Sequence, residues 1–183
     1  STELSAQLDT EDLQRLLQAY RLCLRDVIQK HKGYIAQYLG DGMLVYFGYT
    51  ETQESDCESA LRAALDAINA VQDLPLVAGV KLQVRVGLAT GMVVIGKLVG
   101  AGNTEEVGAI GETPNIAARM QGLAPVGGIV ASESTRAMVG DLFVFRSLGN
   151  VQLKGFSQSH SAWEVLSKQK SLSRFRAKRL KGS

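Results

Sequence analysis

The sequence predicts an α+β fold, in which a mixed sheet carries helices packed on one face. Three patterns predict it: amphipathic helical periodicity, alternating apolar residues typical of half-buried strands, and a Gly-Asp-Gly turn between two β-rich runs. The chain has 183 residues, of which 45% are hydrophobic. That is enough to bury one substantial core, so we expect a single folded domain.

Two long helices are predicted in the first half of the chain. Over residues 8–32 apolar side chains recur with a period of 3.6 residues, and Gly33 is the expected end. A second helix is expected to begin at Ser55, because Ser55 and Glu58 fit a capping box. Its buried side is expected to carry Ala60, Leu61, Ala64, Leu65, Ile68 and Val71. A short helix is expected over residues 133–139.

Strands are predicted between and after these helices. Residues 31–48 fit two short strands joined at Gly40-Asp41-Gly42. Alternation over residues 82–88 predicts a half-buried strand, and a turn at Thr90-Gly91 leads to another strand through Ile95. Shorter strands are expected near residues 128–131, 144–148, 150–153 and 161–166.

The most informative segment is residues 110–120. Thr113 is a suitable N-cap and Pro114 suits the first helical position, which places Asn115 in the first turn. Arg119 follows four residues later on the same face. An amide, a guanidinium and a helix N-terminus together suit phosphate and the charge that develops on it. The alternative is a surface helix with one polar stripe.

Asp41 lies in the predicted turn between the first two strands. A tight turn would hold its carboxylate at the edge of the sheet, where it could bind a hard cation such as Mg²⁺, and the flanking glycines would let a phosphate ligand approach. Turns also favour Asp and Gly for conformational reasons alone, so a purely structural role is the alternative.

These segments together resemble the catalytic domain of the class III nucleotidyl cyclases, bacterial adenylyl cyclases in particular. The resemblance covers the chain from Ser1 to about Val165. It is carried by four motifs in order: QYLGDGMLVYFG at 37–48, VRVGLATG at 84–91, AIGETPNIAAR at 109–119 and LKGF at 153–156. It implies a ferredoxin-like cyclase fold, with a catalytic domain over residues 1–166 and a basic linker or tail over 167–183.

The resemblance implies conversion of ATP to 3′,5′-cyclic AMP and pyrophosphate by two-metal-ion catalysis, with Mg²⁺ or Mn²⁺ as the cations. Asp41 would bind metal. Asn115 would orient the ribose, Arg119 would stabilise charge at the reacting phosphate, and Lys154 would contact the triphosphate. The family divides these residues between two subunits, so the resemblance also implies a homodimer with shared active sites.

Two positions depart from the family pattern for recognition of the base. Gln37 stands where a lysine usually contacts adenine, and Gly108 stands where Asp or Thr is frequent. Gln37 offers both a donor and an acceptor, so it could face adenine or guanine. The preference for ATP over GTP therefore stays open, with ATP favoured by the surrounding motif.

The first central strand of the family, with its metal-binding Asp, is missing from the predicted elements. Ser1-Thr2 matches only the end of that motif. We expect unpaired backbone groups in the middle of the sheet and weak metal binding by this chain. The alternative function is therefore a non-catalytic regulatory or dimerisation module with the cyclase fold.

Charge and composition restrict the partners and the cellular environment. The net charge is +2, but seven of the 20 basic residues follow Val165, and the other 13 accompany 18 acidic residues, a net of −5. We interpret the basic tail as a linker to a regulatory or effector domain, because no aromatic platform for nucleic acid accompanies it.

Neither a membrane-spanning run nor a signal peptide is present, so we expect a cytoplasmic domain that binds neither nucleic acid nor membrane. Cys23 and Cys57 are expected to be reduced, and His31 and His160 are given no metal role.

Overall fold

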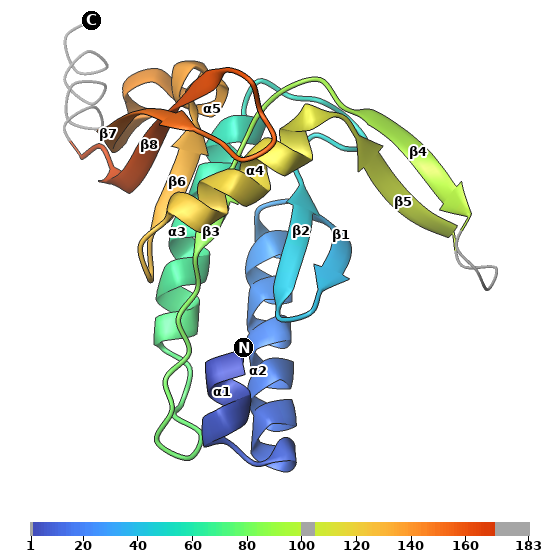
Figure 1. The fold of residues 1–183 in the computed structure, drawn as a ribbon, viewed down its shortest axis with the longest axis vertical. Helices are drawn as coiled ribbons and strands as arrows, with labels where there is room; N and C mark the ends of the chain where they lie inside the picture. The colour runs from blue at the N-terminus through green and yellow to red at the C-terminus, as the bar shows by residue number, and fades with distance from the viewer. Residues whose placement is uncertain (1, 100–104, 171–183) are drawn as a thin grey trace, which may run out of the picture.

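The structure is a computed structural model that describes residues 2–99 and 105–170. Helices and groups of strands follow one another along the chain (Figure 1). The helices are α1 (Thr2–Gln7), α2 (Thr10–Lys30), α3 (Asp56–Gln72), α4 (Glu112–Leu123) and α5 (Glu133–Val139), followed by the 3₁₀ turn η1 (Gly140–Leu142). The strands are β1 (Tyr34–Leu39), β2 (Gly42–Tyr46), β3 (Val86–Leu88), β4 (Val94–Val99), β5 (Glu105–Ile110), β6 (Ile129–Ser132), β7 (Phe143–Gln152) and β8 (Ser159–Lys168).

The first predicted helix, over residues 8–32, corresponds to α2, and the short helix α1 precedes it without having been predicted. Asp9 caps α2, since its carboxylate accepts a hydrogen bond from the Asp12 amide at 2.8 Å. At the other end, Lys32 and not Gly33 takes the left-handed conformation, with φ of 60°. Gly33 is required for space, because a Cβ there would lie 2.8 Å from the Ile28 Cγ2 atom.

The second predicted helix is α3, and its predicted capping box does not form. Ser55 occupies the N-cap position but makes no capping hydrogen bond through its side chain. The Asp56 carboxylate instead accepts from the Gln53 amide at 2.7 Å. The buried side of α3 agrees well with the periodicity and includes Leu61, Ala64, Ile68 and Val71.

The main sheet has four strands in the order β3-β6-β8-β7, with β3 and β6 parallel and the other pairs antiparallel. Of the strand expected over 82–88, only Val86–Leu88 forms, because β6 offers partners in register only to those three residues. The two strands expected over 144–153 are one strand, β7, whose register shifts between Ser147 and Asn150.

Both faces of the main sheet are covered by helices. On one face, Ile129 and Ala131 of β6 pack against α3. The intervening Val130 points the other way and packs with Met120 of α4. The mixed α+β sheet is therefore confirmed, and α4 adds a second covered face to the single one expected from the sequence.

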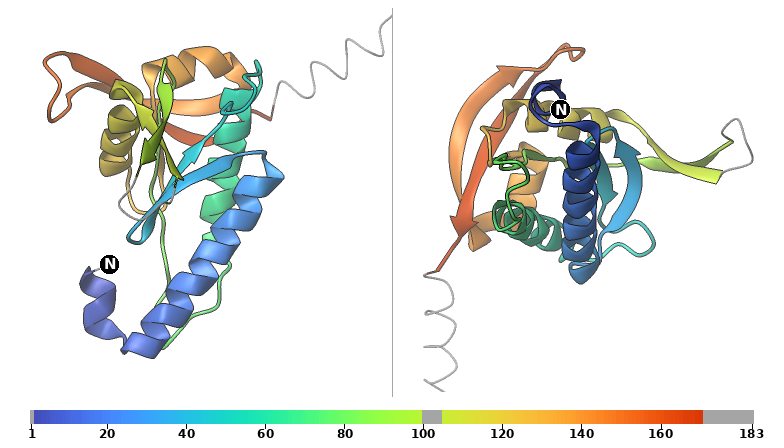
Figure 2. Two further views of the ribbon diagram at one scale, coloured as in Figure 1. Left: turned by 90° about the vertical axis from the view of Figure 1, so that its right-hand side faces the viewer. Right: turned by 90° about the horizontal axis from the view of Figure 1, so that it is seen from below.

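Two hairpins stand apart from the main sheet. β1 and β2 form one two-stranded sheet, and β4 and β5 form another. Within the described residues no strand pairs with β3 on the side away from β6, so the sheet is interrupted between β3 and the β1–β2 hairpin. The β4–β5 hairpin, here called the arm, projects from the body in Figure 1 and in the right-hand view of Figure 2.

Candidate active site

The helix that carries Asn115 and Arg119 begins earlier than the sequence predicts. α4 starts at Glu112, and its N-cap is Gly111, whose φ of 144° suits glycine. The predicted N-cap Thr113 is therefore wrong: its hydroxyl donates to the Met92 carbonyl oxygen at 3.4 Å. Pro114 is the third helical residue, and it is tolerated because the first four amide groups of a helix have no intrahelical partner.

Close packing against the sheet fixes the orientation of α4. The Met120 side chain is fully buried. Gly87 of β3 lies so close to α4 that a Cβ there would be 2.2 Å from the Ala117 carbonyl oxygen. With this face of the helix held against the sheet, Asn115 and Arg119 lie on the exposed face, as the i, i+4 spacing predicts.

Lys154 is placed by a turn that follows β7. Leu153 is buried in the same cluster as Met120, which holds the start of the turn beside α4. The Phe156 amide donates to the Leu153 carbonyl oxygen at 3.1 Å, and Gly155 has φ of 87°. The turn leaves the Lys154 side chain exposed next to the α4 face.

These two segments border an open pocket of about 330 Å³, called here the α4 pocket. Its lining residues are Glu112, Asn115, Arg119, Lys154, Gly155 and Phe156. The structure therefore brings Lys154 together with Asn115 and Arg119, although Lys154 is far from both in the sequence. The pocket offers an amide and two cations to a ligand, a combination suited to phosphate groups.

Three lining residues, Glu112, Gly155 and Phe156, were not among the site residues predicted from sequence. Glu112 precedes Asn115 by three residues, and Arg119 by seven, so helical periodicity places all three on one face. Phe156 belongs to the LKGF motif and packs edge-on against the His160 ring, with centroids 5.2 Å apart. Periodicity could have identified Glu112; only the turn geometry brings Phe156 into the pocket.

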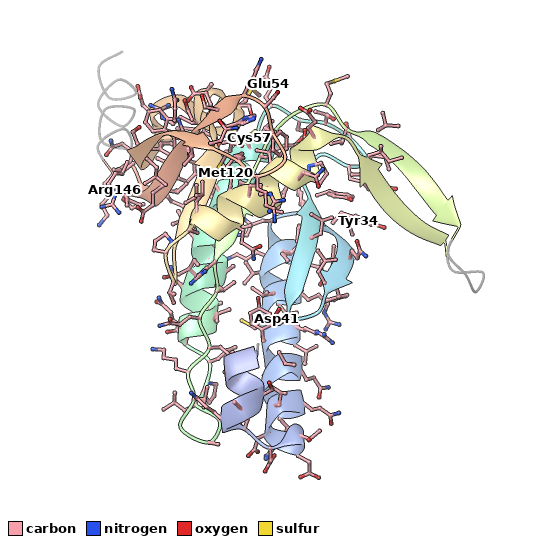
Figure 3. All side chains as sticks on the ribbon, in the orientation of Figure 1. Tyr34, Asp41, Glu54, Cys57, Met120 and Arg146 are labelled. Atoms are coloured by element: carbon pink, nitrogen blue, oxygen red, sulfur yellow. The ribbon has the colours of Figure 1, made fainter. Side chains whose placement is uncertain are left out.

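Asp41 and Gln37 do not line the α4 pocket. Asp41 lies at the end of the β1–β2 hairpin beside α2, as Figure 3 shows. Leu39 pairs with Gly42, so the turn has two residues, and Gly40 has φ of 61°. The predicted turn is confirmed, and the Arg21 side chain holds it by donating to the Gly40 carbonyl oxygen at 2.8 Å.

The described residues do not form a complete metal site. No group of three or more His, Cys, Asp or Glu side chains suited to an ion occurs among them. The Asp41 carboxylate is a hard oxygen donor, and Mg²⁺ in proteins is often bound by one or two carboxylates together with water and substrate phosphates. Asp41 alone fits one such ligand and does not make a closed site.

The remaining predicted residue, Gly108, lies in β5 of the arm and pairs with Gly96 of β4. Next to it, the Ala109 amide donates to the Tyr46 hydroxyl of β2 at 3.1 Å. This bond connects the base of the arm to the hairpin that carries Gln37 and Asp41. The Tyr46 ring in turn lies beside Tyr34 and Tyr49.

The fold and the pocket define a class of protein: an α+β domain with an exposed pocket lined by an amide and two cations, and a separate hairpin that carries a carboxylate. The family described as "Adenylate and Guanylate cyclase catalytic domain" matches residues 1–167. The chain belongs to this family of class III nucleotidyl cyclase domains, whose members are generally metal-dependent.

Relatives in bacteria support the same assignment. The chain is 32% identical over 178 residues to the uncharacterized protein R02095 of Rhizobium meliloti, covering 97% of this chain and 17% of that protein. It is 30% identical over 176 residues to adenylate cyclase 1 of the same organism, covering 90% of this chain and 26% of that protein. The chain thus spans only a small part of these relatives.

Solved structures of both adenylyl and guanylyl cyclases share the fold. The guanylyl cyclase Cya2 superposes with a TM-score of 0.86 at 27% identity, covering 92% of this chain and 87% of that one. The adenylyl cyclase CyaB from P. aeruginosa gives 0.78 at 27% identity, with coverage of 92% and 89%. The ferredoxin-like cyclase fold expected from the sequence is therefore confirmed.

Two further observations concern the helices and the cysteines. None of the helices in the described part of the chain is both long enough and apolar enough to cross a membrane. Cys23 and Cys57 are both free thiols, as predicted. Most of the basic tail, residues 171–183, lies outside the described residues.

Proposed function

We propose that this domain converts ATP to 3′,5′-cyclic AMP and pyrophosphate at sites shared between two copies of the chain. The observation that carries the proposal is the α4 pocket, which collects Asn115, Arg119 and Lys154 on one exposed surface. By their positions in the family motifs, Asn115 matches the residue that orients the ribose, Arg119 the residue at the reacting phosphate, and Lys154 the residue that contacts the triphosphate.

The proposed reaction forms one bond and breaks another at the α-phosphorus of ATP. The ribose 3′-oxygen attacks this phosphorus, the bond to the oxygen bridging the α- and β-phosphates breaks, and pyrophosphate leaves. The proton of the 3′-hydroxyl passes to water. Asn115 would orient the ribose, Arg119 would stabilise the charge that grows on the α-phosphate oxygens, and Lys154 would hold the triphosphate.

Bound Mg²⁺ or Mn²⁺, two per site, would neutralise triphosphate charge and lower the pKa of the attacking hydroxyl. Asp41 would supply one carboxylate ligand. The other ligands would come from water, from the substrate and from outside the described residues. We therefore assign Asp41 a share of the metal site and not the whole of it.

A shared site accounts for the separation of Asp41 from the α4 pocket. If a second copy of the chain placed its hairpin over this pocket, the carboxylate and the two cations would meet. The arm and the segment just before it support this arrangement, because both present apolar side chains to solvent. Val94 and Ile110 of the arm are 67% and 57% exposed, and Met92, which precedes β4, is 95% exposed. Exposed apolar surface of this kind is typical of interfaces between subunits.

The base is proposed to be adenine because of the relatives. Adenylate cyclase 1 of Rhizobium meliloti is 30% identical to the chain, and an adenylate cyclase of Mycobacterium tuberculosis is 28% identical. The Gln37 side chain is compatible with this base but does not select it, because an amide can donate to and accept from the edge of either adenine or guanine. Gly108 contributes no side chain to the choice, so recognition at that position would rely on the backbone.

The test is product formation by the full-length polypeptide that contains this chain. We expect cyclic AMP from ATP with Mg²⁺ or Mn²⁺, less cyclic GMP from GTP, and loss of most activity in Asp41→Ala and Lys154→Ala. Cyclic GMP as the main product would contradict the proposed base. Absence of any cyclic product from the well-folded dimer would favour the alternative, a regulatory module with the cyclase fold.

A further inference from the structure

The α4 pocket contains a carboxylate that a phosphate site does not require. Glu112, Asn115 and Arg119 occupy positions i, i+3 and i+7 of α4, so all three side chains lie on one helix face. Glu112 lines the pocket together with the two cations Arg119 and Lys154. The charged side chains of the pocket therefore sum to +1, where Arg119 and Lys154 alone would give +2.

A carboxylate in this position opposes the binding of highly charged phosphate groups. Two unit charges 4 Å apart in a water-like medium change a binding constant by about fivefold, and more where water is partly excluded. The penalty grows with the negative charge of the ligand. It is largest for free polyphosphate and smaller for a triphosphate whose charge a divalent cation has already reduced.

Glu112 also has an ordinary structural explanation. An acidic residue in the first turn of a helix interacts favourably with the helix dipole, wherever that helix lies. This explanation predicts an effect on stability only. It predicts no effect on the affinity of the pocket for phosphate, so the two roles can be separated by experiment.

We propose that Glu112 sets the specificity of the α4 pocket for phosphate ligands of reduced charge. The Glu112 carboxylate weakens binding of free polyphosphate. The pocket therefore favours a cation-complexed triphosphate over the free form, and pyrophosphate is released faster. The inference deepens the proposed function and rests on it only for the identity of the ligand as a nucleoside triphosphate.

The experiment measures binding of inorganic tripolyphosphate by calorimetry, with and without Mg²⁺. We expect Glu112→Gln to bind free tripolyphosphate about three- to tenfold more tightly than the parent, and to gain less in the presence of Mg²⁺. The gain should shrink at high salt, as expected for a charge exposed to solvent. Lys154→Gln should weaken binding and so confirm that the ligand occupies this pocket.

Glu11→Gln is the matched control. Glu11 is also exposed and also lies in the first turn of a helix, but that helix is α2, and Glu11 does not line the pocket. The substitution makes the same change in net charge and removes a similar interaction with a helix dipole. We expect its affinity for tripolyphosphate to stay within twofold of the parent.

Three outcomes would overturn the inference: an unchanged or weaker affinity in Glu112→Gln, an equal gain in Glu11→Gln, or no measurable binding by either parent or Glu112→Gln. Failure of the proposed function looks different. In that case the full-length polypeptide forms no cyclic nucleotide, while the tripolyphosphate result still separates Glu112→Gln from Glu11→Gln. If cyclisation occurs, Glu112→Gln should also increase inhibition by pyrophosphate.

Discussion

At the scale of single residues, the side chains of the α4 pocket that are exposed to a ligand are different from the neighbouring side chains that stabilise the fold. Arg119 and Lys154 are exposed, whereas their neighbours Met120 and Leu153 are buried in one cluster. The buried residue in each pair holds the backbone in place, and the exposed residue is accessible to a ligand. Substitutions of the exposed members should therefore affect activity far more than stability.

Arg119→Ala tests this separation. Exposed substitutions usually change the free energy of unfolding by less than about 0.5 kcal/mol. Removing one preorganised group from a charge-stabilising site typically lowers turnover by about 10²- to 10³-fold. We expect a melting temperature near that of the parent and loss of most turnover, measured on the same sample. Arg25→Ala, an exposed arginine of α2, should leave both unchanged. If activity fell only in proportion to the folded fraction, Arg119 would be a structural residue.

Tyr20 offers a test of the environment around the β1–β2 turn. Burial, followed by the nearby charges of Asp41 and Cys23, raises the pKa of the Tyr20 phenol from 10.0 to about 12. The neutral phenol is therefore favoured in the folded state, and stability that is fully present below pH 10 should be lost between pH 10 and 12. The expected loss is about 1.4 kcal/mol per pH unit in that window.

Tyr20→Phe removes this titration. Denaturant unfolding at pH 9.5 and 11.5 should show a smaller loss of stability for Tyr20→Phe than for the parent. Tyr38→Phe, which removes a phenol that is 47% exposed, should keep the loss seen in the parent. Equal losses in the parent and Tyr20→Phe would mean that Tyr20 titrates normally in the folded protein.

At the scale of elements, the contact between α4 and β3 decides where the pocket lies. Gly87 allows the helix backbone to approach the strand more closely than any side chain would permit. The helix carries Glu112, Asn115 and Arg119, so its distance from the sheet sets their distance from Lys154. A change in this contact should therefore disturb the whole pocket.

Two glycine substitutions should have opposite effects on stability. In Gly87→Ala the new methyl group would lie 2.2 Å from backbone atoms of Ala117 and Gln121, which cannot move aside. We expect a loss of about 1–3 kcal/mol, as for overpacked cores. In Gly122→Ala, within α4 itself, nothing lies within 4 Å of the new methyl group, and we expect a gain of up to about 1 kcal/mol. Chemical denaturation of both variants measures the difference; a shared sign would contradict the close approach.

At the scale of the whole molecule, the two halves of the proposed site lie on different parts of one chain. The α4 pocket holds the cations, and the β1–β2 hairpin holds Asp41. The bond between the Tyr46 hydroxyl and the Ala109 amide joins the hairpin to the arm within a subunit. A dimer would therefore contain two sites, each drawing on both copies of the chain.

Mixing two inactive variants tests the shared site. In a dimer of Asp41→Ala and Arg119→Ala full-length polypeptides, one of the two sites carries neither substitution. Random pairing of equal amounts should restore about a quarter of the parent activity, because half of the dimers are mixed and each has one intact site. Each variant alone should stay inactive. No recovery despite demonstrated mixed dimers would argue that all site residues act within one subunit.

Much of the fold was determined by the sequence itself. The 3.6-residue period identified the buried sides of α2 and α3, and the Gly-Asp-Gly turn identified the β1–β2 hairpin. The spacing of Asn115 and Arg119 placed them on one face of α4. These features depend on the geometry of one helix or one turn, so local sequence is sufficient to predict them.

Tertiary structure alone decided which of these faces meet. Lys154 reaches the α4 face because Leu153 packs with Met120 from a distant part of the chain, and Asp41 lies outside the pocket because its hairpin stands apart from the main sheet. α4 begins at Glu112, earlier than the sequence predicts, because Gly111 adopts a backbone conformation that suits glycine. Glu112 is therefore part of the helix. Periodicity shows which side of a helix or strand is buried. It does not show which other segment packs against that side, because that contact depends on packing between parts of the chain that are distant in sequence.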